Sequence, residues 1–256
     1  MLIDSHAHLT LPRFDDDREM VIQRAREAGL KHIITVGLEI EDCRKAILLA
    51  DKYDFIFASI GIHPHDVKSI DPKTYSLLKK LSAHEKVVAI GEIGLDFYRN
   101  LSPRKIQIQR FREQLQLARE VSLPVIIHDR EAHQETVKIL QEERAETIGG
   151  VIHCFSGDLS MAKACLDLGF YISIPGTITF KNSQDYQDLV RELPLNRLLL
   201  ETDSPFLTPH PFRGKRNEPA YVYYTAKTVA RVKNIDVAEL ADITTCNAQK
   251  LFGLFP

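Results

Sequence analysis

Residues 87–127 read VVAIGEIGLDFYRNLSPRKIQIQRFREQLQLAREVSLPVII and contain two short apolar runs on either side of a longer polar segment. The two runs, Val87–Ile90 and Pro124–Ile127, are rich in β-branched residues, which is typical of buried strands. The polar segment Arg104–Val121 has the spacing of an amphipathic helix. Its apolar residues fall on one helical stripe: Ile108, Phe111, Leu115 and Ala118. The stretch therefore predicts a strand–helix–strand unit.

Runs of the same kind recur along the whole chain, at intervals of roughly 20–37 residues, about the length of one strand–helix unit. They are Leu2–Asp4, His32–Val36, Phe55–Ile60, Val87–Ile90, Pro124–Ile127, Val151–Phe155, Phe170–Ile174 and Arg197–Leu200. Their continuous apolar character indicates strands buried on both faces, as in parallel sheets. Eight such units predict an α/β fold of the (β/α)₈ TIM-barrel type.

The main rival is a doubly wound open sheet, which usually carries a glycine-rich turn after its first strand. No such turn follows Leu2–Asp4. No linker or change of composition divides the chain, so we expect residues 1–256 to form a single domain. The segment Val237–Phe252 is expected to add one or two capping helices.

Composition limits the possible functions. The chain has 256 residues, 44% of them hydrophobic and 27% charged, with a net charge of −2. These values exclude a disordered chain, and they predict that any contact with nucleic acid is local. No apolar stretch approaches the roughly 18 residues that a membrane span needs. The N-terminal residues lack the features of a secretory signal, and the four cysteines have no C-x-x-C spacing, so we expect a cytoplasmic protein with reduced thiols.

Histidines and acidic residues gather where the apolar runs end. In a (β/α)₈ barrel the carboxyl ends of the strands meet at one mouth, which is where active sites form. The segments at these positions are Asp4–His8, Gly61–His65, Gly91–Asp96, His128–Arg130, His153–Gly157 and Glu201–Asp203. We expect their side chains to converge although they are far apart in the sequence.

Six of these residues are candidate metal ligands. His6 and His8 are two apart on one strand, so both point to the same face and can chelate an ion. Glu92 can bridge two cations. The other three candidates are His128, His153 and Asp203. Taken singly, each could be a hydrogen-bonded core residue or a solvated loop residue, but burying all six without a partner would be costly.

The number and type of donors favour catalysis over structural support. A structural zinc site usually has four ligands that include cysteine. Six nitrogen and oxygen donors instead suit two adjacent divalent cations, such as Mg²⁺, Mn²⁺ or Zn²⁺, with open positions. Two such cations can activate a water molecule and clamp the attacking and leaving oxygens, so the pattern predicts a hydrolase.

Four sequence blocks resemble the signatures of the TatD family of metal-dependent deoxyribonucleases, which belongs to the amidohydrolase superfamily. They are Asp4–Leu9 (DSHAHL), Gly91–Asp96 (GEIGLD), His153–Gly157 (HCFSG) and Glu201–Pro205 (ETDSP). The resemblance covers essentially the whole chain. It implies a two-metal TIM barrel that hydrolyses DNA phosphodiester bonds, often from the 3′ end. The implied substrate is therefore DNA, as single strands or 3′ ends.

The resemblance also implies the roles of the six residues. His6, His8, Glu92 and Asp203 would hold one metal, and Glu92, His128 and His153 the second, with Glu92 bridging. A hydroxide activated by the two metals would attack phosphorus. Glu92 and Asp203 are the expected catalytic residues, and Asp203 is the candidate to orient or deprotonate the water.

Substrate contacts are expected from two further places. His63 lies at the mouth but exceeds the ligand count, so it is a candidate contact to the substrate phosphate. The proline-rich connection Pro205–Pro219 carries the other candidates, Arg213, Lys215 and Arg216. Guanidinium and ammonium groups bind phosphates, although a solvated basic loop is the alternative.

Two other functions stay open at this point. A lactonase, phosphotriesterase or cyclic amidase can use the same fold and two metals, and some of these enzymes bridge the metals with a carbamylated lysine on the fourth strand. The only lysine in the fourth run is Lys86, at its start, which favours Glu92 as the bridge. A non-catalytic metal-binding protein is the second alternative.

Overall fold

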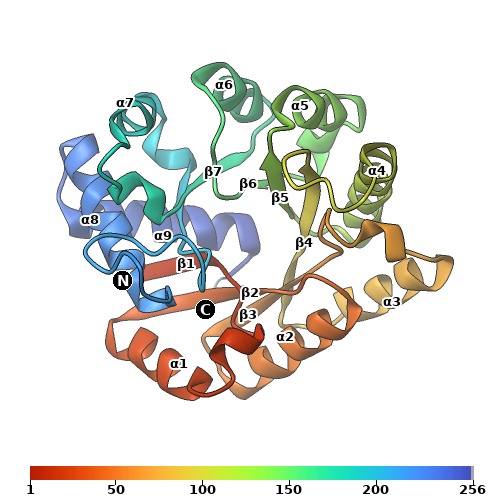
Figure 1. The fold of residues 1–256 in the computed structure, drawn as a ribbon, viewed down its shortest axis with the longest axis horizontal. Coiled ribbons are helices and arrows are strands. Elements are labelled where there is room, and N and C mark those ends of the chain that lie inside the picture. Colours follow the sequence, from red (N-terminus) through yellow and green to blue (C-terminus); the bar gives the residue numbers. More distant parts are fainter. Residues whose placement is uncertain (255–256) are drawn as a thin grey trace.

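The computed structural model describes residues 1–254, which form a ring of helices around eight strands (Figure 1). The strands are β1 (Leu2–Ala7), β2 (Leu30–Val36), β3 (Ile56–Ile60), β4 (Val87–Asp96), β5 (Val125–Arg130), β6 (Gly150–Ile152), β7 (Tyr171–Ile174) and β8 (Leu198–Leu200). They pair in sequence order, and each pair is parallel. This arrangement is the predicted (β/α)₈ barrel.

The barrel is nearly closed, because the segment after β8 returns to β1. The amide of Asp203 donates to the carbonyl of His6 at 2.9 Å, and Ala7 forms an isolated parallel bridge with Ser204. The Ser5 hydroxyl donates to the carbonyl of Leu200 at 3.0 Å. These bonds join the first strand to the last strand and the segment that follows it, and they bring His6 next to Asp203.

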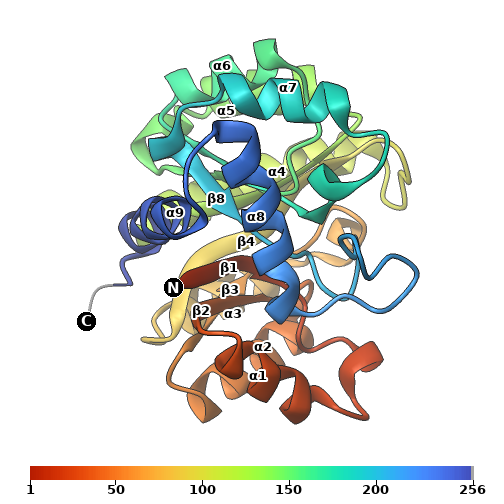
Figure 2. The ribbon, with the colours of Figure 1, turned by 90° about the vertical axis from the view of Figure 1, so that its left-hand side faces the viewer.

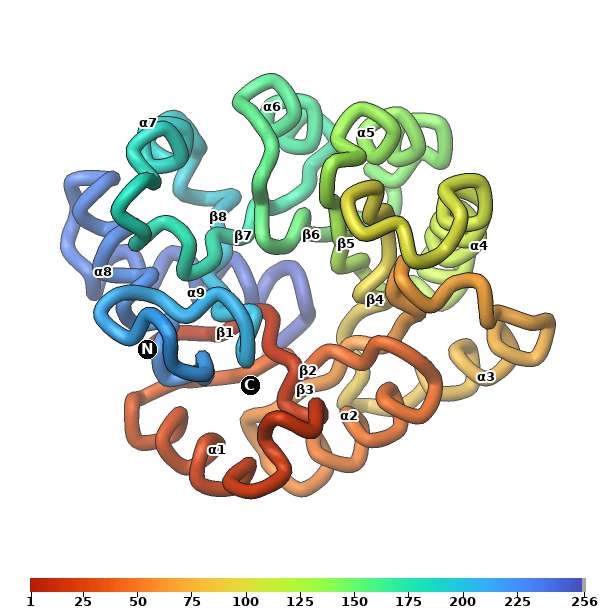
Figure 3. The backbone as a smooth tube through the Cα atoms, in the orientation of Figure 1, coloured from red at the N-terminus to blue at the C-terminus, as the bar shows by residue number. Residues whose placement is uncertain are grey.

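Nine α-helices within residues 1–254 cover the outside and one end of the barrel (Figure 3). They are α1 (Arg18–Glu27), α2 (Ile40–Lys52), α3 (Pro72–Ser82), α4 (Arg104–Val121), α5 (His133–Glu142), α6 (Leu159–Asp167), α7 (Gln184–Glu192), α8 (Val222–Lys233) and α9 (Val237–Phe252). The predicted helix Arg104–Val121 is confirmed as α4, which buries Phe111, Leu115 and Ala118. The main core lies between the helices and the strands.

Helix α9 closes the end of the barrel at which the strands begin. The Asn247 side chain donates to the carbonyls of Leu195 and Leu198, at the start of β8, at 2.9 Å each. Phe252 packs with apolar residues of the strands, including Ile34. Figure 2 shows α9 on the side opposite the long connection that follows β8. The barrel is therefore open only at the carboxyl ends of the strands.

The predicted strands are confirmed, with differences at their ends. β1 continues to Ala7 and β4 to Asp96, so His6 and Glu92 lie within strands. β6 ends at Ile152, which leaves His153 in the turn that follows. Val237–Phe252 forms one helix. None of the helices in residues 1–254 combines the length and the apolarity that a membrane crossing needs.

Candidate metal centre

A cavity of about 920 Å³ opens at the carboxyl ends of the strands. Five of the six predicted ligands line it. The sixth, His6, is fully buried, and its Nε2 lies within 4 Å of the carboxylates of Glu92 and Asp203. The predicted residues on the cavity wall are His8, His63, Glu92, His128, His153 and Asp203. The structure thus brings together residues from six different strands or strand ends.

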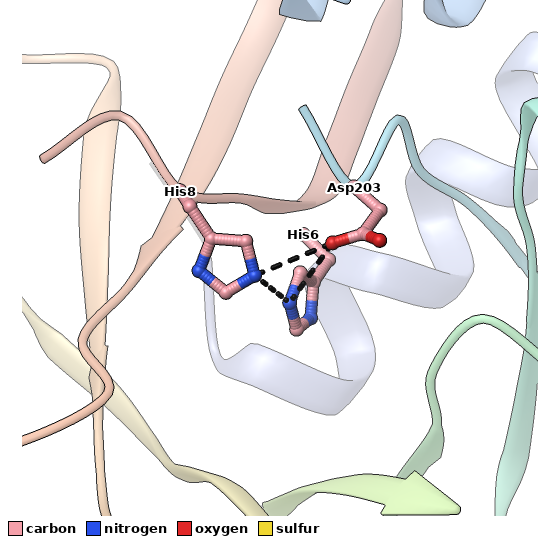
Figure 4. A group of neighbouring side chains, drawn as sticks. All are labelled: His6, His8 and Asp203. Atoms are coloured by element: carbon pink, nitrogen blue, oxygen red, sulfur yellow. Dashed lines mark hydrogen bonds and ion pairs between the residues drawn. The ribbon is translucent and has the colours of Figure 1, made fainter. Parts of the chain in front are cut away.

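One group of donors lies around His6 and His8 (Figure 4). The Nε2 atoms of these two histidines are 3.1 Å apart. Oδ1 of Asp203 lies 3.9 Å from Nε2 of His6 and 3.3 Å from Nε2 of His8. Oε2 of Glu92 completes the group, at 3.3 Å and 3.6 Å from the same two nitrogens.

The second group surrounds the other oxygen of the same glutamate. Oε1 of Glu92 lies 2.6 Å from Nδ1 of His128 and 2.9 Å from Nε2 of His153. Nε2 of His63 is further away, at 3.5 Å. The two oxygens of Glu92 therefore face two different sets of imidazole nitrogens, which is the arrangement that a bridging carboxylate needs.

The first group fits a divalent cation. A tetrahedral ion with ligands at about 2.0–2.2 Å separates its donor atoms by about 3.3–3.6 Å. The separations that involve the two histidine nitrogens run from 3.1 to 3.9 Å, and the donor atoms of His6, His8 and Asp203 all lie within 4.8 Å of one another. Nδ1 of His8 lies 3.3 Å from the carbonyl oxygen of Val36 and is placed to donate to it, so its Nε2 presents a lone pair. Nδ1 of His6, in contrast, has no hydrogen-bond partner among residues 1–254.

Carboxylates behind the histidines orient two further rings. Oδ2 of Asp96 lies 3.1 Å from Nε2 of His128, which leaves Nδ1 of that ring to face Glu92. Oε1 of Glu201 lies 3.3 Å from Nδ1 of His153, an ion-pair distance without hydrogen-bond geometry, and its negative charge favours a proton on Nδ1 and a lone pair on Nε2. Carboxylate groups that hold the far nitrogen of a histidine are a common feature of metal sites.

The charges of the metal-free site are strongly coupled. Burial opposes ionisation of Glu92, but His153, His63 and His6 together hold the pKa of its carboxyl well below the ordinary value of 4.5. Burial also disfavours a charge on His128, yet the contacts with Asp96 and Glu92 raise its pKa to about 8. A cation would take the place of such a proton, because a histidine binds metal with a deprotonated nitrogen.

Glycines let β4 carry Glu92 close to β5. A Cβ atom on Gly91 would lie 2.6 Å from the Cβ atom of Ile126. Gly94 has a φ of 137°, and a Cβ atom there would clash with the carbonyl oxygen of His128. Only glycine tolerates both the contact and the backbone conformation at Gly94. The predicted position of Glu92 between two glycines therefore has a steric reason.

His63 is placed as a donor. The amide of His65 donates to Nδ1 of His63 at 3.1 Å, so the neutral ring carries its proton on Nε2. Burial lowers the pKa of His63 to about 4, which keeps the ring neutral near pH 7. This ring therefore presents an N–H group, and not a lone pair, to the cavity.

The basic residues of the Pro205–Pro219 connection make contacts within the protein, and not with the cavity. Arg216 pairs with Asp17 at 2.7 Å and stacks over Phe14. Arg213 donates to the carbonyl of Thr208 at 2.9 Å and stacks over a further ring, that of Phe180. Neither these two arginines nor Lys215 lines the cavity. Their predicted role in substrate binding stays a prediction.

Lys86 lies at the opposite end of β4 from Glu92. Its Nζ atom faces three backbone carbonyls near the start of β3, among them that of Asp54 at 3.0 Å. A lysine held there cannot reach the cavity. The position that a bridging lysine would need at the carboxyl end of β4 is occupied by Glu92.

Two residues that were not among the predicted site residues also line the cavity. Cys154 has a φ of 45° and faces the cavity, although side chains that alternate along a strand would turn it to the face opposite its neighbour His153. His133 lies at the start of α5, and its Nδ1 contacts Asp129 at 2.5 Å. The four-residue spacing of Asp129 and His133 was an available signal. The sequence around Cys154 gives no comparable signal for its positive φ.

The comparisons with known proteins agree on one family. A family model described as TatD related DNase matches residues 3–253. The chain is 49% identical to the "Uncharacterized metal-dependent hydrolase YabD" of Bacillus subtilis, over 99% of this chain and 100% of that protein. It is 39% identical to the "3'-5' ssDNA/RNA exonuclease TatD" of Erwinia amylovora, over 99% and 100%. The crystal structure of YJJV, a TatD homolog from Escherichia coli K12, superposes with a TM-score of 0.93 at 33% identity, over 99% and 98%.

Proposed function

The chain belongs to the family of TatD-related DNases, whose members include metal-dependent hydrolases, and we propose that it is a 3′-5′ exonuclease that hydrolyses single-stranded DNA with two divalent cations. The observation that carries the proposal is the division of the Glu92 carboxylate between two groups of donors. One carboxylate in contact with two sets of imidazole nitrogens is best explained by two cations.

We assign the ligands from these contacts. The first cation would be held by His6, His8, Asp203 and Oε2 of Glu92, because the two carboxylate oxygens lie 3.3–3.9 Å from the Nε2 atoms of the two histidines. The second would be held by Nδ1 of His128, Nε2 of His153 and Oε1 of Glu92. Both sets contain only nitrogen and oxygen donors: the imidazoles suit Zn²⁺, and the carboxylates also suit Mn²⁺ and Mg²⁺.

Bound divalent cations would supply Lewis-acid stabilisation of the phosphate oxygens and promote ionisation of water. The chain supplies proton transfer and orientation. Asp203 contacts the histidines through Oδ1, while Oδ2 points away from them (Figure 4), so Oδ2 is free to accept the proton of the attacking water. Nε2–H of His63 is placed to donate a hydrogen bond to a phosphate oxygen.

The shape of the cavity supports action at the end of a strand. Its volume of about 920 Å³ lies within the range of pockets that enclose one small ligand. Such a pocket suits the last nucleotides of a flexible single strand better than a continuous duplex. The Erwinia amylovora relative is named a 3'-5' exonuclease of single-stranded DNA and RNA, which supports single-stranded nucleic acid as the class of substrate.

The test uses a 5′-labelled single-stranded oligonucleotide, with an aryl phosphodiester and a lactone as companions. We expect progressive shortening of the labelled strand from its 3′ end, complete inhibition by EDTA, and recovery with Mg²⁺, Mn²⁺ or Zn²⁺. Hydrolysis of the lactone without any hydrolysis of DNA, under all three metals, would contradict the proposal and favour another two-metal hydrolase.

Two variants test the assigned residues in the same assay. Glu92→Gln and Asp203→Asn should lose turnover while the circular dichroism of the protein is unchanged. The matched controls are Glu192→Gln and Asp242→Asn, which change exposed carboxylates on α7 and α9. Undiminished turnover in both site variants would remove Glu92 and Asp203 from the chemistry.

A further inference from the structure

Large apolar side chains are exposed at few places in residues 1–254, and one of these places is the mouth of the cavity. Of the seven large hydrophobic residues that are exposed in this part of the chain, three lie at or beside the cavity. They are Tyr98 (56% exposed), Leu101 (54%) and Phe206 (43%); Leu101 and Phe206 line the cavity, and Tyr98 adjoins Arg99, which also lines it. An exposed aromatic ring beside a binding cavity suggests a ligand with an apolar face.

Each of the two aromatic rings has an arginine over it. The guanidinium carbon of Arg130 lies 4.5 Å from the centre of the Tyr98 ring, and that of Arg13 lies 5.8 Å from the centre of the Phe206 ring. Both arginines are exposed, and within residues 1–254 neither forms an ion pair with a carboxylate. They differ in this respect from Arg216, whose charge is neutralised by Asp17.

The two pairs flank the metal centre from opposite sides. Tyr98 follows β4 and Phe206 follows β8, and strands four apart in the order of an eight-stranded barrel face each other across the mouth. Phe206 packs edge-on against His8, with ring centres 6.2 Å apart, at the His6–His8–Asp203 end. Tyr98 comes two residues after Asp96, which contacts His128 at the other end.

We propose that these two pairs, Arg13 with Phe206 and Arg130 with Tyr98, are nucleotide subsites, one for each of the two nucleotides joined by the scissile phosphate. This inference rests on the proposed function and specifies how the substrate is held. In each subsite the aromatic ring stacks on a base, and the unpaired guanidinium contacts a flanking phosphate. A ring with an adjacent cation is the usual arrangement for single-stranded nucleic acid, and it binds any base.

The decisive experiment combines substitutions in the protein with removal of bases from the substrate. The protein variants are Phe206→Ala and Tyr98→Ala, with Tyr223→Ala as the control, because Tyr223 is 47% exposed on α8 and does not line the cavity. The substrates are short DNA strands in which the nucleotide on the 5′ or the 3′ side of the scissile phosphate is intact or abasic. All proteins are assayed with the activating metal, and their melting temperatures are compared.

Each site variant should lower kcat/KM on intact DNA by about 5-fold to 150-fold, which is the range that one stacked base supplies. Phe206→Ala should hardly change kcat/KM on the substrate that lacks the base on one side of the scissile phosphate. Tyr98→Ala should hardly change kcat/KM on the substrate that lacks the base on the other side. Tyr98→Phe should restore full activity, because stacking needs the ring and not the hydroxyl. Tyr223→Ala should resemble the wild type.

Two outcomes would overturn the inference while leaving the proposed function intact. The site variants could hydrolyse intact DNA as fast as the wild type does, or they could lose the same factor on intact and abasic substrates. Failure of the wild-type protein to hydrolyse any of the DNA strands would instead reject the proposed function, and the inference with it.

Discussion

Nε2 of His6 lies 3.1 Å from Nε2 of His8, inside a group that also contains one oxygen of Glu92 and one of Asp203. Two imidazole nitrogens this close either share a proton or face a common cation. Burial lowers the pKa of His6 to about 3, so a proton is poorly held on that ring. Burial also disfavours a charge on His8, yet the contacts with Asp203 and Glu92 raise its pKa, so without a cation the proton stays on His8. A cation would take the place of that proton, because a histidine binds metal with a deprotonated nitrogen. The pair is therefore prepared for a cation.

Replacement of the bridge should remove metal and activity together. In Glu92→Gln the carboxylate charge is lost while the shape of the side chain is kept. Because substitution of a group behind a ligand already costs about 10- to 100-fold in metal affinity or activity, we expect turnover to fall by more than about 100-fold here. Metal analysis should show less bound metal than in the wild type. Full metal content together with full turnover would contradict the bridging role.

Glu201 should act through His153. This carboxylate is fully buried, and its Oε1 accepts from the amide of Cys154 at 2.8 Å and faces Nδ1 of His153. In Glu201→Gln we expect metal affinity to fall by about 10- to 100-fold, with turnover recovered at high metal concentration. The exposed variant Glu192→Gln serves as the control. Equal metal affinity in the two variants would show that Glu201 has only a structural role.

The metal-free protein should lose stability in acid through His63. Burial lowers the pKa of this ring from 6.5 to about 4, so below pH 6.5 the unfolded chain binds a proton that the folded protein does not. As the pH decreases from 6.5 to 4, this group therefore lowers the free energy of unfolding by at most about 1.4 kcal/mol per pH unit. We expect urea unfolding in the presence of EDTA to show that the free energy of unfolding decreases less for His63→Gln than for the wild type between pH 6.5 and pH 4. Parallel curves would contradict this prediction.

Arg216 should contribute more to stability than to DNA binding. Its ion pair with Asp17 joins the connection after β8 to the segment before α1. Since partly exposed ion pairs contribute up to about 1 kcal/mol, Arg216→Ala should lower the melting temperature by about 2–4 °C. The salt dependence of KM should change less in Arg216→Ala than in a variant with both Arg13→Ala and Arg130→Ala, because within residues 1–254 the guanidinium groups of Arg13 and Arg130 form no ion pair with a carboxylate. A larger change for Arg216→Ala would support the role in substrate binding that the sequence predicted.

The parts of the molecule that the sequence predicted are those with a regular period. The eight apolar runs and the stripe of Arg104–Val121 have the periodicity of strands and helices, so both are found where they were expected. The convergence of His6, His8, Glu92 and Asp203 followed from that fold, because in a parallel barrel all strand ends of one kind meet at the same mouth.

The features that were missed depend on local backbone conformation or on contacts between distant loops. Strand β6 ends at Ile152, three residues before the end of the apolar run Val151–Phe155, and Cys154 turns toward the cavity with a φ of 45°. The Arg216–Asp17 pair and the Arg13–Phe206 contact each join residues almost 200 positions apart in loops without periodicity. Only the folded chain brings them together.

Anomalous diffraction from crystals grown with Mn²⁺ or Zn²⁺ would locate the two cations that Glu92 is proposed to bridge. We expect two anomalous peaks: one among His6, His8 and Asp203, the other beside His128 and His153, with one oxygen of Glu92 against each. A single peak, or peaks away from Glu92, at saturating metal would contradict the account.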